Sequence, residues 1–307
     1  MHKVLLVSNP RAGTTSPRTK EVIVKALAAD FKLEVADTAA RGHASELAAD
    51  AVDRDFEAVL AFGGDGTINE VSQGLVGSEV ALGMLPGGST NVFTRSVGVP
   101  RDPVEATAFV ASRLRSQTRR RIHVGTLTTD GEQPRHFLFA AGMGLDAEVV
   151  KRVEADPEAK RRRGEWFFLR NAIAAGLTDY RSVEPAIEMR IQGSEPERLV
   201  FVVCCNSRPF TYFKRMPVDA CPEARLDRGL DLFGLTKVRA ATVPRVAWGV
   251  LVSRSHVRWR NGRYHHDVDG ADLRASRPLP VQVDGDYIGD RSGITLGLQR
   301  SALDLLV

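Results

Sequence analysis

Apolar and polar positions follow two alternating periods along the first part of the chain. Continuous apolar runs, typical of buried strands, occur at 4–7, 58–62 and 79–86. Residues 31–37 alternate like a further strand. Apolar residues at helical spacing predict helices at 18–30, 43–52, 92–99 and 103–114, with another beginning at 68. Strands that alternate with short helices predict βαβ units around a parallel sheet.

The pattern changes beyond residue 123. Strand-like segments bounded by turn residues then dominate, at 135–144, 186–193, 197–206, 230–236 and 278–289. Convincing helical patterns are found only at 165–177 and 243–254. We therefore predict two domains, 1–123 and a mainly antiparallel 124–307, and leave open whether the last strand returns to the first domain.

Composition narrows the class of protein. The 307 residues are 43% hydrophobic and 26% charged, with a net charge of +4, which is too mild for a nucleic-acid-binding tail. Cys204, Cys205 and Cys221 lack metal-ligand spacing and are expected to be small buried residues in a reducing compartment. The apolar run after Lys3 is too short for a secretory signal, and no run is long enough to span a bilayer. We expect a soluble, cytoplasmic protein that binds no nucleic acid.

Three glycine-rich turns follow successive predicted strands, at 9–13, 63–67 and 86–91. In an open parallel sheet, ligands bind beyond the carboxyl ends of the strands, where these turns would meet. Glycine lets the backbone approach a phosphate, and a following helix N-terminus adds favourable partial charge. The turns lack the lysine of a P-loop. They predict a different kind of polyphosphate-binding site.

Asp65 is unusual in such a turn, because a carboxylate repels phosphate. An acidic residue at this position is explained if Asp65 reaches a Mg²⁺ ion that bridges nucleotide phosphates. The alternative is that Asp65 only caps the helix that begins near Thr67.

A second acidic pair follows the apolar run "PLPVQV". Asp284 and Asp286 are two residues apart and would point to one face of a strand. Transfer of phosphate to a hydroxyl needs a carboxylate to accept the hydroxyl proton, so either residue is a candidate base. With Gly285 between them, the same residues could form a hairpin turn without a function.

The segments "NPRAG", "GGDGTINEV" and "LPGGSTNVFTRSVGVP", in that order, resemble the diacylglycerol kinase catalytic-domain family, which includes soluble bacterial lipid kinases and the sphingosine and ceramide kinases. The resemblance covers nearly the whole chain. It continues through "AAGMGLDAEVV", "KRRRGEWFFLRNAI", "CPEARLDRGLDLF" and "PLPVQVDGDYIG".

This resemblance implies an α/β fold: an ATP-binding domain related to NAD kinase and phosphofructokinase, followed by a β-sandwich-like lipid domain. ATP with Mg²⁺ would bind in the cleft between the domains. The residues implied to bind ATP are Asn9, Pro10, Arg11, Ala12, Gly13, Thr38, Gly64, Asp65, Gly66, Thr67, Ile68, Asn69, Glu70, Gly88, Ser89 and Asn91. Asp284 or Asp286 would deprotonate the lipid hydroxyl, with diacylglycerol as the expected acceptor.

Two departures from the family pattern concern its metal-linked acids. Val92 stands where the family usually has an aspartate, and Asp227-Arg228 stands where it has two successive aspartates beside a structural Mg²⁺. We hypothesise that Arg228 replaces that ion and donates hydrogen bonds toward the first domain. The alternative is that Arg228 is a solvated surface residue.

A lipid kinase must reach a membrane, here expected at its inner face. Two basic, aromatic clusters are candidates for peripheral contact: 160–168 and 253–266. The residues leave open a homodimer, another acceptor such as a sphingosine-like lipid, an NAD-kinase-like enzyme, and a silent nucleotide- or lipid-binding module.

Overall fold

The computed structural model describes residues 2–13, 15–155, 184–213, 215–238, 249 and 254–307. The predicted helix at 165–177 and nearly all of that at 243–254 lie outside the described residues. The chain forms two compact units. The first unit comprises Met1–Val124 with Arg300–Val307, and the second comprises Gly125–Gln299. The structure divides the chain after residue 124, and the sequence predicted a boundary after residue 123.

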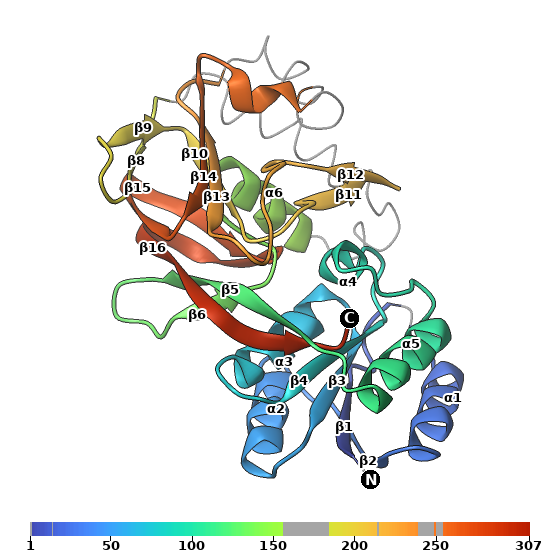
Figure 1. Cartoon of the computed structure of the whole chain (residues 1–307). Coiled ribbons are helices and arrows are strands. Elements are labelled where there is room, and N and C mark those ends of the chain that lie inside the picture. The colour runs from blue at the N-terminus through green and yellow to red at the C-terminus, as the bar shows by residue number, and fades with distance from the viewer. Residues whose placement is uncertain (1, 14, 156–183, 214, 239–248, 250–253) are drawn as a thin grey trace. The chain divides into compact units, whose positions relative to one another are not determined.

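The first unit is built on a parallel sheet (Figure 1). Its strands are β1 (Lys3–Ser8), β2 (Lys32–Asp37), β3 (Ala58–Gly63) and β4 (Ala81–Pro86). They lie in the order β2-β1-β3-β4, with parallel pairing throughout. The C-terminal end of β16 (Asp286–Leu305) adds a further parallel strand, where Leu305 pairs with Leu82 of β4. Every residue of β3 and β4 is buried, as expected for a sheet covered on both faces.

Helices cover this sheet. They are α1 (Pro17–Ala28), α2 (His43–Asp53), α3 (Asp65–Leu75), α4 (Val92–Ser96) and α5 (Pro103–Arg115). Helix α1 packs against α5, and α2 packs against α3. Helices α1 and α5 each begin with a proline that follows a capping residue. Ser16 accepts a hydrogen bond from Thr19 N, and Asp102 accepts one from Val104 N.

The second unit is mainly antiparallel. Its sheet runs in the order β14-β13-β10-β7-β15-β16, with antiparallel pairing between neighbours. These strands are β7 (Ala140–Met143), β10 (Phe201–Cys205), β13 (Leu230–Leu235), β14 (Gly262–Val268) and β15 (Gly270–Val283), with β16 as above. Side chains from all of these strands except β14 form one buried apolar core.

Smaller elements complete the second unit. They are β5 (Arg120–Thr128), which enters from the first unit, β6 (Arg135–Phe137), α6 (Leu145–Glu154), β8 (Ile187–Arg190), β9 (Glu197–Leu199), β11 (Thr211–Phe213), β12 (Met216–Val218) and the 3₁₀ helix η3 (Ser255–Arg258). Strands β11 and β12 form a separate two-stranded sheet.

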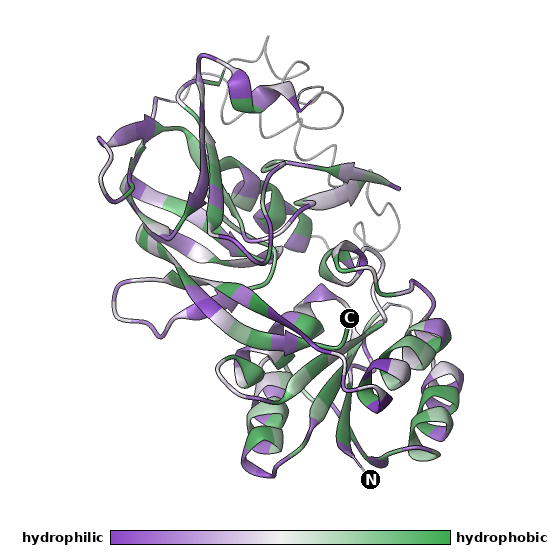
Figure 2. Cartoon of the chain, in the orientation of Figure 1, coloured by the Kyte–Doolittle hydropathy of each residue, from purple (hydrophilic) through white to green (hydrophobic). Residues whose placement is uncertain are grey.

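The predicted fold class is confirmed: a parallel α/β unit is joined to a largely antiparallel one. Figure 2 shows the central strands of the first unit in green, while its helices carry both green and purple residues. That difference is the basis on which buried strands and amphipathic helices were distinguished in the sequence.

Candidate active site

The nucleotide-binding residues predicted from the sequence lie at the carboxyl ends of the four parallel strands. Residues 9–13 follow β1, Thr38 follows β2, residues 64–70 follow β3, and residues 88–91 follow β4. Because parallel strands end at the same edge of a sheet, the structure brings all of these segments to one edge of the first unit.

Two of these loops touch through their backbones. The Gly87 N–H donates to the Gly63 carbonyl at 2.7 Å. A Cβ atom added to Gly88 would lie 2.8 Å from the Gly64 Cα, closer than real contacts allow. Glycine is therefore required here for close approach of the two loops. The exposed backbone of such a turn, together with the N-terminus of α3, suits an anionic ligand.

The loop after β1 is tied to α3. Asn9 donates from Nδ2 to the Thr67 hydroxyl at 3.0 Å, and its backbone N–H donates to the Phe62 carbonyl. Ile68, which was predicted to contact ATP, has a fully buried side chain. Its side chain therefore belongs to the core, and only its backbone can take part in a loop contact.

Asp65 joins the loop after β3 to helix α4. It is the first residue of α3, and its two carboxylate oxygens accept hydrogen bonds from the backbone N–H groups of Val92 (2.9 Å) and Phe93 (3.1 Å). Asp65 thus caps α4 rather than its own helix, a partner that the sequence did not reveal. The metal-linked role of Asp65 stays a prediction.

We expect Asp65→Asn to reduce turnover by orders of magnitude without unfolding the protein. An amide offers a single acceptor oxygen, so one of the two α4 amides loses its partner, and the carboxylate charge is lost as well. Steady-state rates at varied ATP concentration, with circular dichroism as the folding control, test this. A near-wild-type rate would refute any role of Asp65 in the reaction.

The second acidic segment forms a tight turn between β15 and β16. Val283 pairs with Asp286, and the two residues between them both have positive φ, +48° at Asp284 and +80° at Gly285. Positive φ at both central residues is the pattern of type I′ hairpins, which favour Asp-Gly. The expectation that Asp284 and Asp286 point to one face of a strand is therefore wrong, because the turn breaks the alternation.

The Asp284 carboxylate is buried and serves as an anchor. It is 5% exposed and accepts three backbone hydrogen bonds, from Leu138 (2.7 Å), Phe139 (3.0 Å) and Ala140 (3.0 Å). These N–H groups belong to the chain that enters β7. They stabilise the ionised carboxylate and leave it little room for a substrate.

Asp286 lies in different surroundings. Its side chain is 27% exposed and forms an ion pair with Arg135 at 2.8 Å. Arg135, on β6, holds the carboxylate in one orientation without enclosing it. Of the two candidate bases, Asp286 is the one whose environment leaves it accessible to a substrate hydroxyl.

A buried network that we did not identify from the sequence supports this turn. The Gly285 N–H donates to Gln282 Oε1 at 2.9 Å, and Gln282 Nε2 donates to Asp146 at 3.0 Å. Asp146 lies in the first turn of helix α6, and its other carboxylate oxygen, Oδ1, is buried and accepts no hydrogen bond from the described residues. The available signal was Gln282 itself, the one polar residue in the apolar segment 278–283.

Helix α6 also holds the hairpin beyond the turn. Lys151 forms an ion pair with Asp290 at 3.0 Å and lies over the ring of Tyr287. Glu154 accepts a hydrogen bond from the Tyr287 backbone N–H. Together with Asp146, these contacts fasten the hairpin that carries Asp286 along the length of α6.

Burial raises the pKa of Asp146 to about 6, with the hydrogen bond from Gln282 opposing the shift. Because the folded protein then holds this proton more tightly than the unfolded chain, stability falls as pH rises between the ordinary value and about 6. Asp146→Asn cannot titrate. We expect the wild type to lose about 1 kcal/mol relative to Asp146→Asn between about pH 5 and about pH 8. Urea unfolding of both proteins measures this difference, and a pH-independent difference would contradict it.

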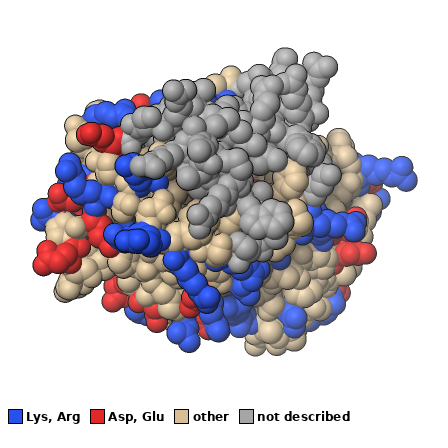
Figure 3. Space-filling view, turned by 90° about the horizontal axis from the view of Figure 1, so that it is seen from above, with Lys and Arg blue, Asp and Glu red and all other residues tan. Residues whose placement is uncertain are grey.

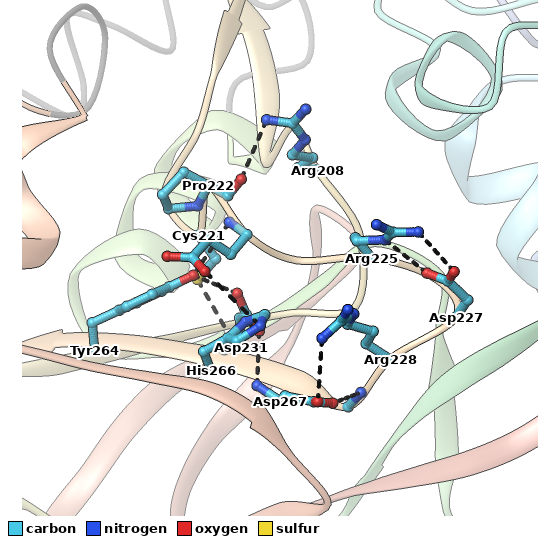
Figure 4. Close-up of polar contacts among 12 residues, drawn as sticks. Arg208, Cys221, Pro222, Arg225, Asp227, Arg228, Asp231, Tyr264, His266 and Asp267 are labelled. Carbon is cyan, nitrogen blue, oxygen red and sulfur yellow. Dashed lines mark hydrogen bonds and ion pairs between the residues drawn. The ribbon is translucent and has the colours of Figure 1, made fainter.

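Figure 4 shows the loop in which the family resemblance implied a structural Mg²⁺. Arg225 and Asp227 form a two-pronged ion pair at 2.9 and 2.8 Å. Arg228 lies 3.8 Å from Asp267, whose other carboxylate oxygen accepts the Gly229 N–H at 2.6 Å. Arg228 thus approaches an acid of its own unit. Its hydrogen bonds toward the first domain stay a prediction.

The remaining acid of this loop is also occupied. Asp231 is fully buried and accepts hydrogen bonds from the Tyr264 hydroxyl, from His266 Nδ1 (2.8 Å) and from the Asp267 N–H (3.2 Å). Burial and the adjacent Asp231 raise the pKa of Tyr264. Within the described ranges, no three His, Cys, Asp or Glu side chains are grouped to hold a metal. The residues of this loop therefore do not fit a structural divalent ion.

This loop and the acidic turn lie at the same edge of the second sheet. Asp231 of β13 is in register with Cys205 of β10, and Cys205 is in register with Ala140 of β7. Ala140 in turn accepts the Asp284 N–H at 2.7 Å. Three strand spacings, about 14 Å, separate Asp231 from the turn.

Comparisons with known proteins agree on one family. Residues 3–127 match the model of the "Diacylglycerol kinase catalytic domain". The diacylglycerol kinase of Bacillus subtilis (strain 168) is 27% identical over 98% of this chain and 95% of its own length.

Two solved structures show a similar fold. A crystal structure of a diacylglycerol kinase from Bacillus anthracis str. Sterne superposes with a TM-score of 0.70 at 18% identity, over 99% of this chain and 96% of the other. An NAD kinase from Archaeoglobus fulgidus in complex with ATP superposes with a TM-score of 0.51 at 12% identity, over 99% and 93% of the two chains.

Proposed function

Because residues 3–127 match the model of the diacylglycerol kinase catalytic domain, and a diacylglycerol kinase is similar along nearly the whole chain, we propose that this protein is a lipid kinase that transfers the γ-phosphate of ATP to a lipid hydroxyl, with diacylglycerol as the acceptor. The observation that carries the proposal is the pair of Gly64 and Gly88 loops. They bring two phosphate-type turns into backbone contact at the carboxyl edge of the parallel sheet, within the segment that matches the family model.

The loops at the carboxyl ends of the parallel strands support ATP as the phosphate donor. Backbone N–H groups and the N-terminus of α3 would bind phosphate oxygens, and Asn9 and Thr67 fix the neighbouring loop. The similarly folded NAD kinase from Archaeoglobus fulgidus was solved with ATP, which also favours this donor.

In the second unit, Asp286 is proposed as the general base. The lipid hydroxyl oxygen would attack the γ-phosphorus while its proton passes to the Asp286 carboxylate, and the bond to the β-phosphate oxygen breaks to release ADP. Arg135 keeps the carboxylate oriented for this transfer. Asp284 holds the turn through its three amide bonds and is assigned no proton.

A Mg²⁺ ion bound with the nucleotide would neutralise phosphate charge as it develops. Asp65 is the residue that we propose beside it. Asp65 also fixes α4 at the end of the loop that follows β4.

The acceptor is proposed to be reached from the membrane surface. Among the residues that the structure describes, no helix is both long and apolar enough to cross a bilayer. Of the two clusters named from the sequence, 160–163 and 166–168 lie outside the described residues, whereas Arg258 and Arg260 of the second are exposed.

The proposal is tested by phosphate transfer from labelled ATP to diacylglycerol, monoacylglycerol, sphingosine and polyprenol in detergent micelles with Mg²⁺. Parallel reactions contain NAD or no acceptor. A labelled diacylglycerol is the expected product. Label on another lipid would change the acceptor, and label on NAD would replace the proposal by an NAD kinase. ATP binding without transfer to any acceptor would leave a silent module.

A further inference from the structure

The hairpin formed by β11 and β12 stands apart from the main sheet of the second unit. Phe213 pairs with Met216, and Thr211 pairs with Val218. Within the described part of the chain, the two strands pair only with each other (Figure 1).

The base of this hairpin is fixed to the body of the unit. The Phe210 N–H donates to the Val218 carbonyl at 3.0 Å, and Val218 is buried. The next residue, Asp219, is buried as well and forms an ion pair with Arg254 at 2.6 Å. The hairpin is therefore held at the end where β12 leaves it.

The first residue of β12, Met216, is apolar and exposed to solvent. Met216 is 50% exposed, and it is the most exposed large hydrophobic residue that the structure describes. The other three, Val22, Val35 and Val104, all belong to the first unit. Burial of a methionine side chain is favourable, so this position gains free energy from an apolar partner.

The charge of the segment is of one sign. Residues 207–218 contain Arg208, Lys214 and Arg215 and no acidic residue, and they also contain three aromatic residues. Arg215 is exposed and makes no ion pair with a described carboxylate. Arg208 donates only to the Pro222 carbonyl among its described contacts (Figure 4). The segment thus offers cations that are not neutralised within the described structure.

We propose that Phe213, Arg215 and Met216, at the end of the β11–β12 hairpin, dock on a bilayer that contains anionic phospholipid. A methionine with aromatic neighbours enters the headgroup boundary, while arginine keeps its guanidinium at the phosphates and lays its apolar stem along the surface. The hairpin belongs to the unit that carries Asp286, so docking would bring the proposed base toward membrane-embedded acceptors. The inference rests on the proposed function for its choice of a membrane as partner.

A bilayer is favoured over a nucleic acid because Met216, an apolar side chain beside these cations, is half exposed. The charge of this view is mixed: in Figure 3, Lys and Arg side chains (blue) and Asp and Glu side chains (red) both lie on either side of the view. Docking is therefore expected to depend on this hairpin rather than on overall charge.

The test is co-sedimentation of the full chain with vesicles of phosphatidylcholine, with and without phosphatidylglycerol. We expect binding to the anionic vesicles, and a loss of affinity of about tenfold in Met216→Asp and in Arg215→Glu. Two matched controls make the same charge changes at exposed positions elsewhere, Val104→Asp in the first unit and Arg277→Glu in the second, and should bind like the wild type.

Equal binding by the wild type and both hairpin variants would overturn the inference, as would absence of wild-type binding or an equal loss in the controls. Each variant is first checked for folding by circular dichroism. Binding is measured without ATP, so it is independent of catalysis. If the wild type labels no acceptor in micelles but binds vesicles through the hairpin, the proposed function fails and the docking surface stands. If it labels lipid and the hairpin variants bind normally, only the docking surface fails.

Discussion

Asp286→Asn is expected to lower kcat by about 10²- to 10⁴-fold while the protein keeps its fold, because an amide cannot accept the hydroxyl proton. The side chain is partly exposed and contacts Arg135 through one ion pair, so its loss should change stability little. Rates with saturating ATP and lipid, measured beside urea unfolding, separate the two effects.

A matched control for this variant lies on the neighbouring strand. Asp272 is exposed on β15 and accepts a hydrogen bond from the Thr295 hydroxyl, so Asp272→Asn removes the same charge from the same sheet. It should retain the wild-type rate. If Asp286→Asn also retained that rate, Asp286 would not be the base.

Asp284→Asn is expected to have the opposite signature, a loss of stability of about 3 kcal/mol. The carboxylate accepts three backbone N–H groups in a buried position, whereas an asparagine offers one acceptor oxygen and brings an NH₂ group against donors. Any fall in activity would follow from displacement of the turn and should be partly recovered by a ligand that stabilises the folded state.

Urea unfolding of Asp284→Asn beside the wild type measures this change directly. A stable Asp284→Asn protein without turnover would reverse the assignment and make Asp284 the base. The two substitutions together decide a question that residue spacing left open, because both aspartates belong to the same short motif.

Much of the first unit could be predicted from the sequence because its elements are regular. The apolar runs at 4–7 and 58–62 became β1 and β3, and the helical patterns at 18–30 and 103–114 became α1 and α5. Local periodicity and capping are enough for such elements.

The role of each acid could not be predicted, because it depends on partners distant in the chain. Asp65 bonds to residues 92 and 93, and Asp284 bonds to residues 138–140. Asp146 lies in the segment "AAGMGLDAEVV", but the sequence indicates no role for it, because its partner Gln282 is more than a hundred residues away. Motif spacing can bring such residues to attention, but only the folded chain shows which carboxylate is buried and which is accessible.

The course of β16 bears on how the chain is made. This strand begins in the second unit, and its residues beyond 299 complete the sheet of the first, where Leu303, Leu305 and Leu306 are fully buried and Leu305 pairs with Leu82. A ribosome must therefore synthesise the whole second unit before the first can close its apolar edge. Until then, β4 is an open template for wrong pairing, so the nascent protein depends on the speed with which its last strand arrives.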